Sequence, residues 1–111
     1  MKSYTDLEQS KKLAEFLSIE SADMRFCFSH TLGGRITGHY PMIGREPSLG
    51  TIPCWSLAAL LEIIRNNGRY ELQMYEGGYY FEANGFMTES YFNPIDACYE
   101  MILKLHEQKL L

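Results

Sequence analysis

The chain has 111 residues, 46% of them hydrophobic and 14% aromatic, and its formal net charge is −4. This length and apolar content indicate one folded domain over residues 1–111 and exclude a disordered tail. The acidic balance argues against nonspecific nucleic-acid binding, which depends on clustered lysine and arginine. The longest apolar run, residues 57–61, is far shorter than the roughly 20 residues of a membrane span, so we expect no nucleic-acid partner and no membrane insertion.

The three cysteines, Cys27, Cys54 and Cys98, are widely spaced along the chain. An odd number without short spacings is not a disulfide framework, so we expect buried thiols. The first twenty residues contain no apolar stretch of the kind found in secretory signals. These features predict a reducing, cytoplasmic location.

The first predicted element is a helix over residues 5–18. Thr5 and Glu8 have the spacing of a capping box, and Ser18 ends the amphipathic pattern. Residues 24–28 indicate a strand, after which residues 29–51 contain five of the nine glycines.

A turn at Gly33-Gly34 would form a hairpin, with Thr31 opposite Ile36 and Phe28 opposite His39. Pro41 interrupts the returning strand, so we expect a long loop from there to Thr51. Long loops in small domains often carry function, which makes this segment the first place to look for a site.

A second helix is predicted from Pro53, which suits a first-turn position. Only Ala58, Glu62 and Arg65 form a weakly polar stripe, so this helix is expected to be buried on most sides. The sequence at 66–68, Asn-Asn-Gly, is typical of a helix end.

The strongest pattern in the chain is a hairpin over residues 70–83, turning at Gly77-Gly78. One face of this hairpin is apolar, and the other carries a tyrosine pair. The predicted register pairs Tyr75 with Tyr80, Met74 with Phe81, Gln73 with Glu82 and Leu72 with Ala83.

The third predicted helix begins at Asn93 as N-cap, with Pro94 at the first helical position and Asp96 in the first turn. Because the predicted strands pair as hairpins, the fold class is α+β. We expect a small antiparallel sheet of two hairpins packed against about three α-helices.

Several stretches resemble a group of small uncharacterised bacterial proteins, some of them in phages and mobile elements. The resemblance spans most of the chain and implies a whole-chain domain, but it implies no activity and no catalytic residue. The stretches that carry it are Glu8-Gln9-Ser10-Lys11-Lys12-Leu13, Ser21-Ala22-Asp23-Met24, Pro53-Cys54-Trp55-Ser56-Leu57-Ala58-Ala59-Leu60-Leu61 and Pro94-Ile95-Asp96-Ala97.

Cys54 is the best candidate for chemistry, because it follows Pro53 at a predicted helix N-terminus, where the helix dipole lowers a thiol pKa. His30 or His39 from the glycine-rich segment could then form a Cys–His pair with it. The competing interpretation is a buried cysteine beside Trp55, and no nucleophile motif surrounds Cys54 to oppose it.

The residues that could bind metal are His30, His39, His106 and the cysteines, and they lack the short spacings of metal sites. We therefore expect no metal and no cofactor. Arg35 and Arg45 could hold an anion, but no phosphate-binding glycine motif surrounds them.

Aromatic residues lie on both faces of the predicted 70–83 hairpin. Tyr75, Tyr80 and Tyr79 are candidate binding residues, because exposed tyrosines suit protein interfaces. The rings could instead only stabilise the hairpin. A base-stacking platform is a further alternative, but it lacks the basic groove of such sites.

The sequence thus favours a small cytoplasmic binding or accessory module that acts on another protein. The alternative is a thiol-dependent enzyme centred on Cys54 with a loop histidine. A weak homodimer through residues 70–83 is also expected, because the sheet edge between Tyr70 and Phe81 has no lysine or proline to deter another chain.

Overall fold

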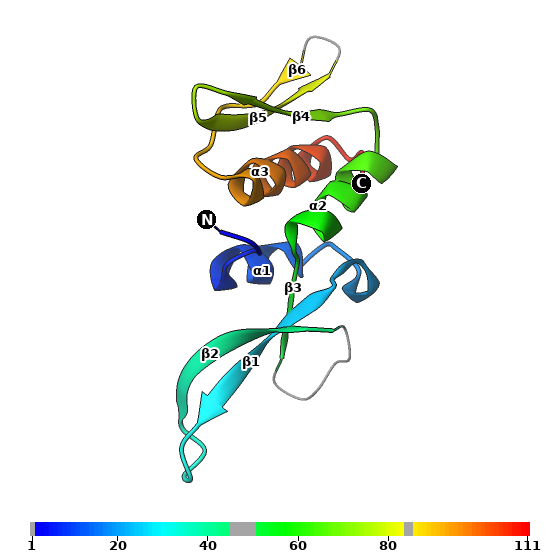
Figure 1. Ribbon diagram of the computed structural model, residues 1–111. Helices are drawn as coiled ribbons and strands as arrows, with labels where there is room; N and C mark the ends of the chain where they lie inside the picture. Colours follow the sequence, from blue (N-terminus) through cyan, green and yellow to red (C-terminus); the bar gives the residue numbers. More distant parts are fainter. Residues whose placement is uncertain (1, 45–50, 84–85) are drawn as a thin grey trace.

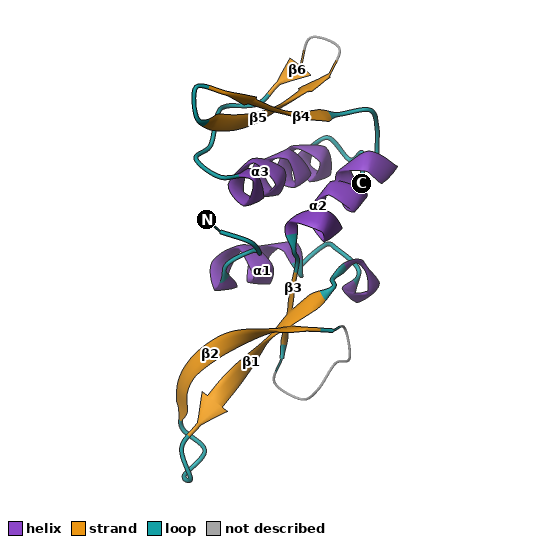
Figure 2. Cartoon of the chain, viewed as in Figure 1, coloured by secondary structure: helices purple, strands orange, loops and turns teal. Residues whose placement is uncertain are grey.

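The computed structural model describes residues 2–44, 51–83 and 86–111. The molecule is elongated, measuring 54 × 29 × 20 Å. One sheet lies at one end above helices α2 and α3, and the β1–β2 hairpin projects from the other end (Figures 1 and 2). In chain order the elements are α1 (Leu7–Leu13), η1 (Ile19–Ser21), β1 (Met24–His30), β2 (Ile36–Ile43), β3 (Ile52–Cys54), α2 (Leu57–Asn66), β4 (Glu71–Tyr75), β5 (Gly78–Ala83), β6 (Phe86–Met87) and α3 (Pro94–Glu107).

The strands form two antiparallel three-stranded sheets, with orders β2-β1-β3 and β4-β5-β6. This confirms the α+β class and both predicted hairpins. Within the described ranges, none of the helices has the length and apolar character that crossing a bilayer requires.

The first hairpin has the predicted pairing of Phe28 with His39. A β-bulge between Ser29 and His30 then places His30 opposite Ile36, so the predicted Thr31–Ile36 pair is wrong. The strand also continues to Ile43, where a loop was expected after Pro41. Proline is tolerated there because β2 is an edge strand. Residues 45–50, the middle of the expected loop, lie outside the described residues.

The second helix begins later than predicted. Pro53 is not in a helix but in β3, where it pairs with Arg25 of β1. Helix α2 starts at Leu57, and the Ser56 hydroxyl caps it by accepting a hydrogen bond from the Ala59 amide at 3.3 Å. The carboxylate of Asp23 holds this cap by accepting hydrogen bonds from the Ser56 amide, at 2.9 Å, and from the Ser56 hydroxyl.

The first helix also differs from its predicted limits. Its N-cap is Asp6, which forms a capping box with Gln9, one residue beyond the predicted pair of Thr5 and Glu8. Thr5 is instead buried and accepts a hydrogen bond from the Trp55 amide at 3.1 Å. The helix ends at Leu13, before the predicted limit at Ser18.

The core lies between α2, α3 and the face of β4–β5 that is turned toward α3 (Figure 1). Helix α3 begins as predicted, with the Asn93 side chain accepting a hydrogen bond from the Asp96 amide at 2.9 Å. The apolar positions on these elements therefore face one another. The side chains with less than 2% exposure that fill the core include Trp55, Leu60, Ile64, Phe81, Ile95, Met101, Ile102 and Leu105.

The β4–β5 register is two residues away from the predicted one, because the turn is made by Glu76 and Gly77 and Gly78 belongs to β5. Glu76 and Gly77 have φ angles of 50° and 77°, the left-handed pair that a type I′ turn requires. Gly78 packs so closely on Ser90 that a Cβ would lie 3.0 Å from the serine Cβ. A shift of two residues preserves which side chains share a face. The observed pairs are Tyr75 with Gly78, Met74 with Tyr79, Gln73 with Tyr80, Leu72 with Phe81 and Glu71 with Glu82.

Candidate functional site

Cys54 is not at a helix N-terminus, because it is the last residue of β3. Its side chain is 0% exposed, and its sulfur lies 3.4 Å from the Thr5 carbonyl oxygen and 3.7 Å from the Thr5 hydroxyl. Burial raises the pKa of the Cys54 thiol, and hydrogen bonds from Thr5 and Ser10 only partly oppose this. A buried, protonated thiol is a poor nucleophile, so this environment is typical of a structural cysteine.

The two histidines proposed as partners of Cys54 belong to the projecting hairpin. His39 lies on β2, and its ring packs edge-on against buried Phe26 with 5.4 Å between the ring centroids. His30 ends β1, and its side chain lies outside the description. Among the contacts of the described side chains, Cys54 has none with a histidine.

The other two cysteines are also outside any disulfide; Cys98 is buried as expected, whereas Cys27 is half-buried, against the expectation that all three thiols are buried. Burial raises the pKa of Cys98 to about 12, and the Cys27 thiol lies 3.5 Å from the Met42 sulfur. In the described ranges no three His, Cys, Asp or Glu side chains are grouped as a metal would require. Arg35 is exposed near the turn of the β1–β2 hairpin, and Arg45 lies outside the described residues.

The candidate tyrosines are divided between the two faces of the β4–β5 hairpin. Tyr75 and Tyr80 lie on the face of the hairpin that is turned away from the core, together with Glu71, Gln73 and Glu82. We call the surface formed by these five residues the outer face. Tyr75 is 68% exposed and Tyr80 is half-buried. They are diagonal neighbours and not the directly opposed pair predicted from the sequence.

Tyr79 occupies the opposite face, where it packs against the core. Tyr79 therefore contributes to the support of the hairpin and not to its outer face. The structure brings together Tyr75 and Tyr80, and it separates Tyr79 from them.

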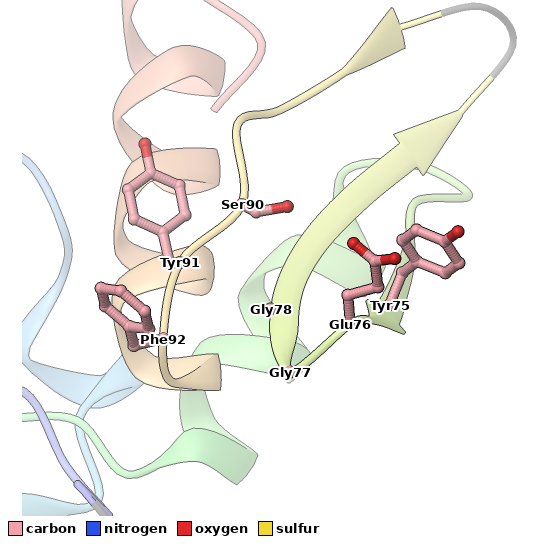
Figure 3. Close-up of a pocket in the computed structure, with 7 residues that line it drawn as sticks. All are labelled: Tyr75, Glu76, Gly77, Gly78, Ser90, Tyr91 and Phe92. Carbon is pink, nitrogen blue, oxygen red and sulfur yellow. The ribbon is translucent and has the colours of Figure 1, made fainter.

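A recess of about 330 Å³ adjoins the outer face at the hairpin turn. Figure 3 shows Tyr75 and Glu76 on one side of the Gly77–Gly78 backbone, with Tyr91 and Phe92 on the other side. Phe92 is 95% exposed, an unusual state for a phenylalanine. An accessible recess flanked by aromatic rings is a suitable place for a partner side chain to insert.

The segment that forms the far wall of this recess is fixed to β5 by backbone hydrogen bonds. The Tyr79 and Tyr91 amides each donate to the other residue's carbonyl, at 2.8 and 2.9 Å. Thr88 adds a second link, because its hydroxyl accepts a hydrogen bond from the buried Phe81 amide at 2.9 Å. These bonds hold one wall of the recess against β5, and a wall positioned before binding lowers the entropic cost of binding.

Sequence reasoning missed Glu76, Ser90, Tyr91 and Phe92 as parts of the site. Their proximity depends on the bridge between Tyr79 and Tyr91, which no local pattern encodes. The one available signal was the pair of adjacent aromatic residues, Tyr91 and Phe92, directly before the helix cap at Asn93.

The charged side chains of the outer face and of the recess lining are carboxylates. Glu71 and Glu82 are directly opposed across β4 and β5, and Glu76 lines the recess. Burial raises the pKa of Tyr91, and the negative charges of Glu100, Glu89 and Asp96 raise it further. The outer face and the recess therefore present aromatic rings in an acidic setting.

Comparisons with protein-family models, with curated proteins and with solved structures find no match to this chain. The resemblance to small bacterial proteins therefore stays a prediction.

Proposed function

We propose that this chain is a binding or accessory module that recognises another protein through the outer face of the β4–β5 hairpin and the adjoining recess. The observation that carries the proposal is the exposure of Tyr75, 68%, on a face whose other side is anchored in the core. Tyrosine provides large contact area with little loss of side-chain freedom, and it is enriched at protein interfaces.

A cytoplasmic location belongs to the same proposal, because the free thiols of Cys27, Cys54 and Cys98 fit a reducing compartment. The bacterial origin that the resemblance implies is also part of this proposal. The alternative of a thiol-dependent enzyme draws no support from the buried position of Cys54. Binding is therefore the function that we retain.

Site-specific photo-crosslinking tests the proposal. A benzophenone amino acid replaces Tyr75 in one variant and, as a matched control, Tyr40 in another; Tyr40 is 46% exposed but lies on β2 at the other end of the molecule. We expect irradiation in a lysate of the source organism to give a discrete protein adduct with the Tyr75 variant only. Adducts at Tyr40 alone, or at neither position, would contradict the proposal.

A further inference from the structure

We propose that the segment bound by the outer face and the recess is cationic, a lysine- or arginine-bearing stretch of a partner protein. This inference rests on the proposed function and specifies the chemistry of the partner. It starts from an unpartnered sheet face with exposed aromatic rings, and the charge around those rings selects the occupant.

The first argument is the excess of negative charge on the β4–β5 hairpin that carries the outer face; the nearest cations along the chain are Arg69 before β4 and Lys104 in α3. From Tyr70 to Leu103 the chain has no lysine and no arginine. The carboxylate of Asp96 within this range is paired with Lys2 at 2.9 Å. Over the described residues, by contrast, no ion pair involves Glu71 of β4, Glu82 of β5, Glu76 of the turn between these strands, or Glu89, which follows β6.

The second argument is the position of Glu71 directly opposite Glu82. Like charges at opposed positions of an antiparallel pair destabilise it. An ammonium or guanidinium group bound between the two carboxylates would replace this repulsion by attraction. The arrangement therefore favours a bound cation over the free state.

The third argument is the type of side chain beside these carboxylates. Tyr75 and Tyr80 share the outer face with Glu71 and Glu82, and Phe92 borders the recess. A cation over the face of an aromatic ring is attracted by the ring electrons, and arginine stacks on such rings. The carboxylates can pair with the positive charge of an arginine guanidinium, and the accessible rings can stack on its planar face.

The same charge disfavours the other occupants. Nucleic acid and anionic membrane surfaces carry the same sign as the face, and so does the corresponding face of a second copy. A cationic protein segment is the remaining occupant whose charge complements the surface.

Peptide binding tests the inference directly. The probes are fluorescein-labelled octa-arginine and octaglutamine, and binding is followed by fluorescence anisotropy. The variant Glu71→Gln, Glu82→Gln removes two charges from the outer face. The matched control, Glu8→Gln, Glu15→Gln, removes two charges from exposed glutamates at and just beyond helix α1 and changes the net charge equally.

We expect wild type and the control variant to bind octa-arginine with similar affinity, and the outer-face variant to bind about fivefold more weakly or worse. Backbone amide NMR shifts induced by the peptide should centre on Gln73, Tyr75 and Tyr80. Equal loss in both variants, equal binding of octaglutamine, or shifts centred on β1 and β2 would each overturn the inference.

The photo-crosslinking experiment separates the two levels of the proposal. If the partner peptide joined to the Tyr75 probe has no lysine or arginine near the crosslink, the cationic inference fails and protein recognition stands. If no adduct forms at Tyr75, the proposed function itself fails.

Discussion

Lys2 Nζ lies 2.9 Å from Asp96 Oδ1, so a residue near the start of the chain is joined to the first turn of α3. The Gln9 side-chain amide donates to the same oxygen at 2.8 Å, and the Asn93 side-chain amide donates to the other carboxylate oxygen at 2.8 Å. One carboxylate therefore links the N-terminal segment, α1 and α3.

The first prediction concerns the pH dependence that this carboxylate causes. Burial alone would raise the pKa of Asp96, but the hydrogen bonds from Lys2, Gln9 and Asn93 outweigh it and lower the pKa below 3.8. When folding lowers the pKa of a carboxyl group, its ionised form stabilises the folded protein at pH values above the pKa it has in the unfolded chain. This stabilisation is lost as the pH falls through the pKa it has in the folded protein. We therefore expect Asp96→Asn to lose about 1–2 kcal/mol at pH 7 and to differ less from wild type below about pH 3. Urea unfolding at both pH values measures this, and a constant difference would contradict it.

The second prediction concerns the core. Leu60 is 0% exposed in α2, so Leu60→Ala should reduce the free energy of unfolding by about 2–5 kcal/mol. Against a typical total of about 5–15 kcal/mol, this could leave the protein partly unfolded. The control Leu110→Ala removes an exposed leucine and should cost less than about 0.5 kcal/mol. Denaturant titration of both variants compares them, and similar losses would place Leu60 outside the core.

The third prediction concerns the strained turn. Glu76 adopts a left-handed φ of 50°, a conformation that asparagine tolerates better than glutamate. Glu76→Asn should raise the free energy of unfolding by about 1 kcal/mol and weaken octa-arginine binding. Glu71→Asn is the control, because it removes a charge from an extended strand where asparagine is disfavoured. If Glu76→Asn destabilised the protein, the turn would not be under the strain inferred here.

The fourth prediction separates the thiols by reactivity. Cys27 is partly exposed, whereas Cys54 and Cys98 are buried with raised pKa values. Iodoacetamide at neutral pH should therefore modify Cys27 first and the other two only after unfolding. Mass spectrometry of the digested protein follows each site. Rapid modification of Cys54 in the folded protein would revive the thiol-enzyme alternative.

The fifth prediction concerns self-association through the 70–83 hairpin. The edge strand β4 remains available for pairing, but pairing there would bring two negatively charged β4–β5 hairpins side by side. We expect a weak dimer whose affinity increases with salt, because screening reduces this repulsion. Sedimentation equilibrium at low and high ionic strength measures it. A protein that stays monomeric throughout the micromolar range at both salt concentrations would rule this dimer out.

The sequence by itself determined the features that arise from neighbouring residues. Asn93 and Pro94 specify the start of α3 because their side chains act on the first turn of the helix they begin. The alternation of side chains around Gly77 specifies which residues share a face of the hairpin, and this assignment survived a register shift of two residues. These local preferences were sufficient for the α+β class.

Only the tertiary structure decided the features that depend on distant partners. Thr5 has a capping pattern, but its hydroxyl instead accepts a hydrogen bond from the Trp55 amide and donates one to the Cys54 sulfur. Asp6 therefore becomes the cap. Pro53 has a helix-start pattern, but pairing with Arg25 places it in a strand and leaves Cys54 buried there. The recess exists because Tyr91 pairs with Tyr79 across the chain. Each outcome depends on an interaction between residues far apart in sequence. The free energy of that interaction exceeds a local preference of about 1 kcal/mol, and it cannot be known from the local sequence.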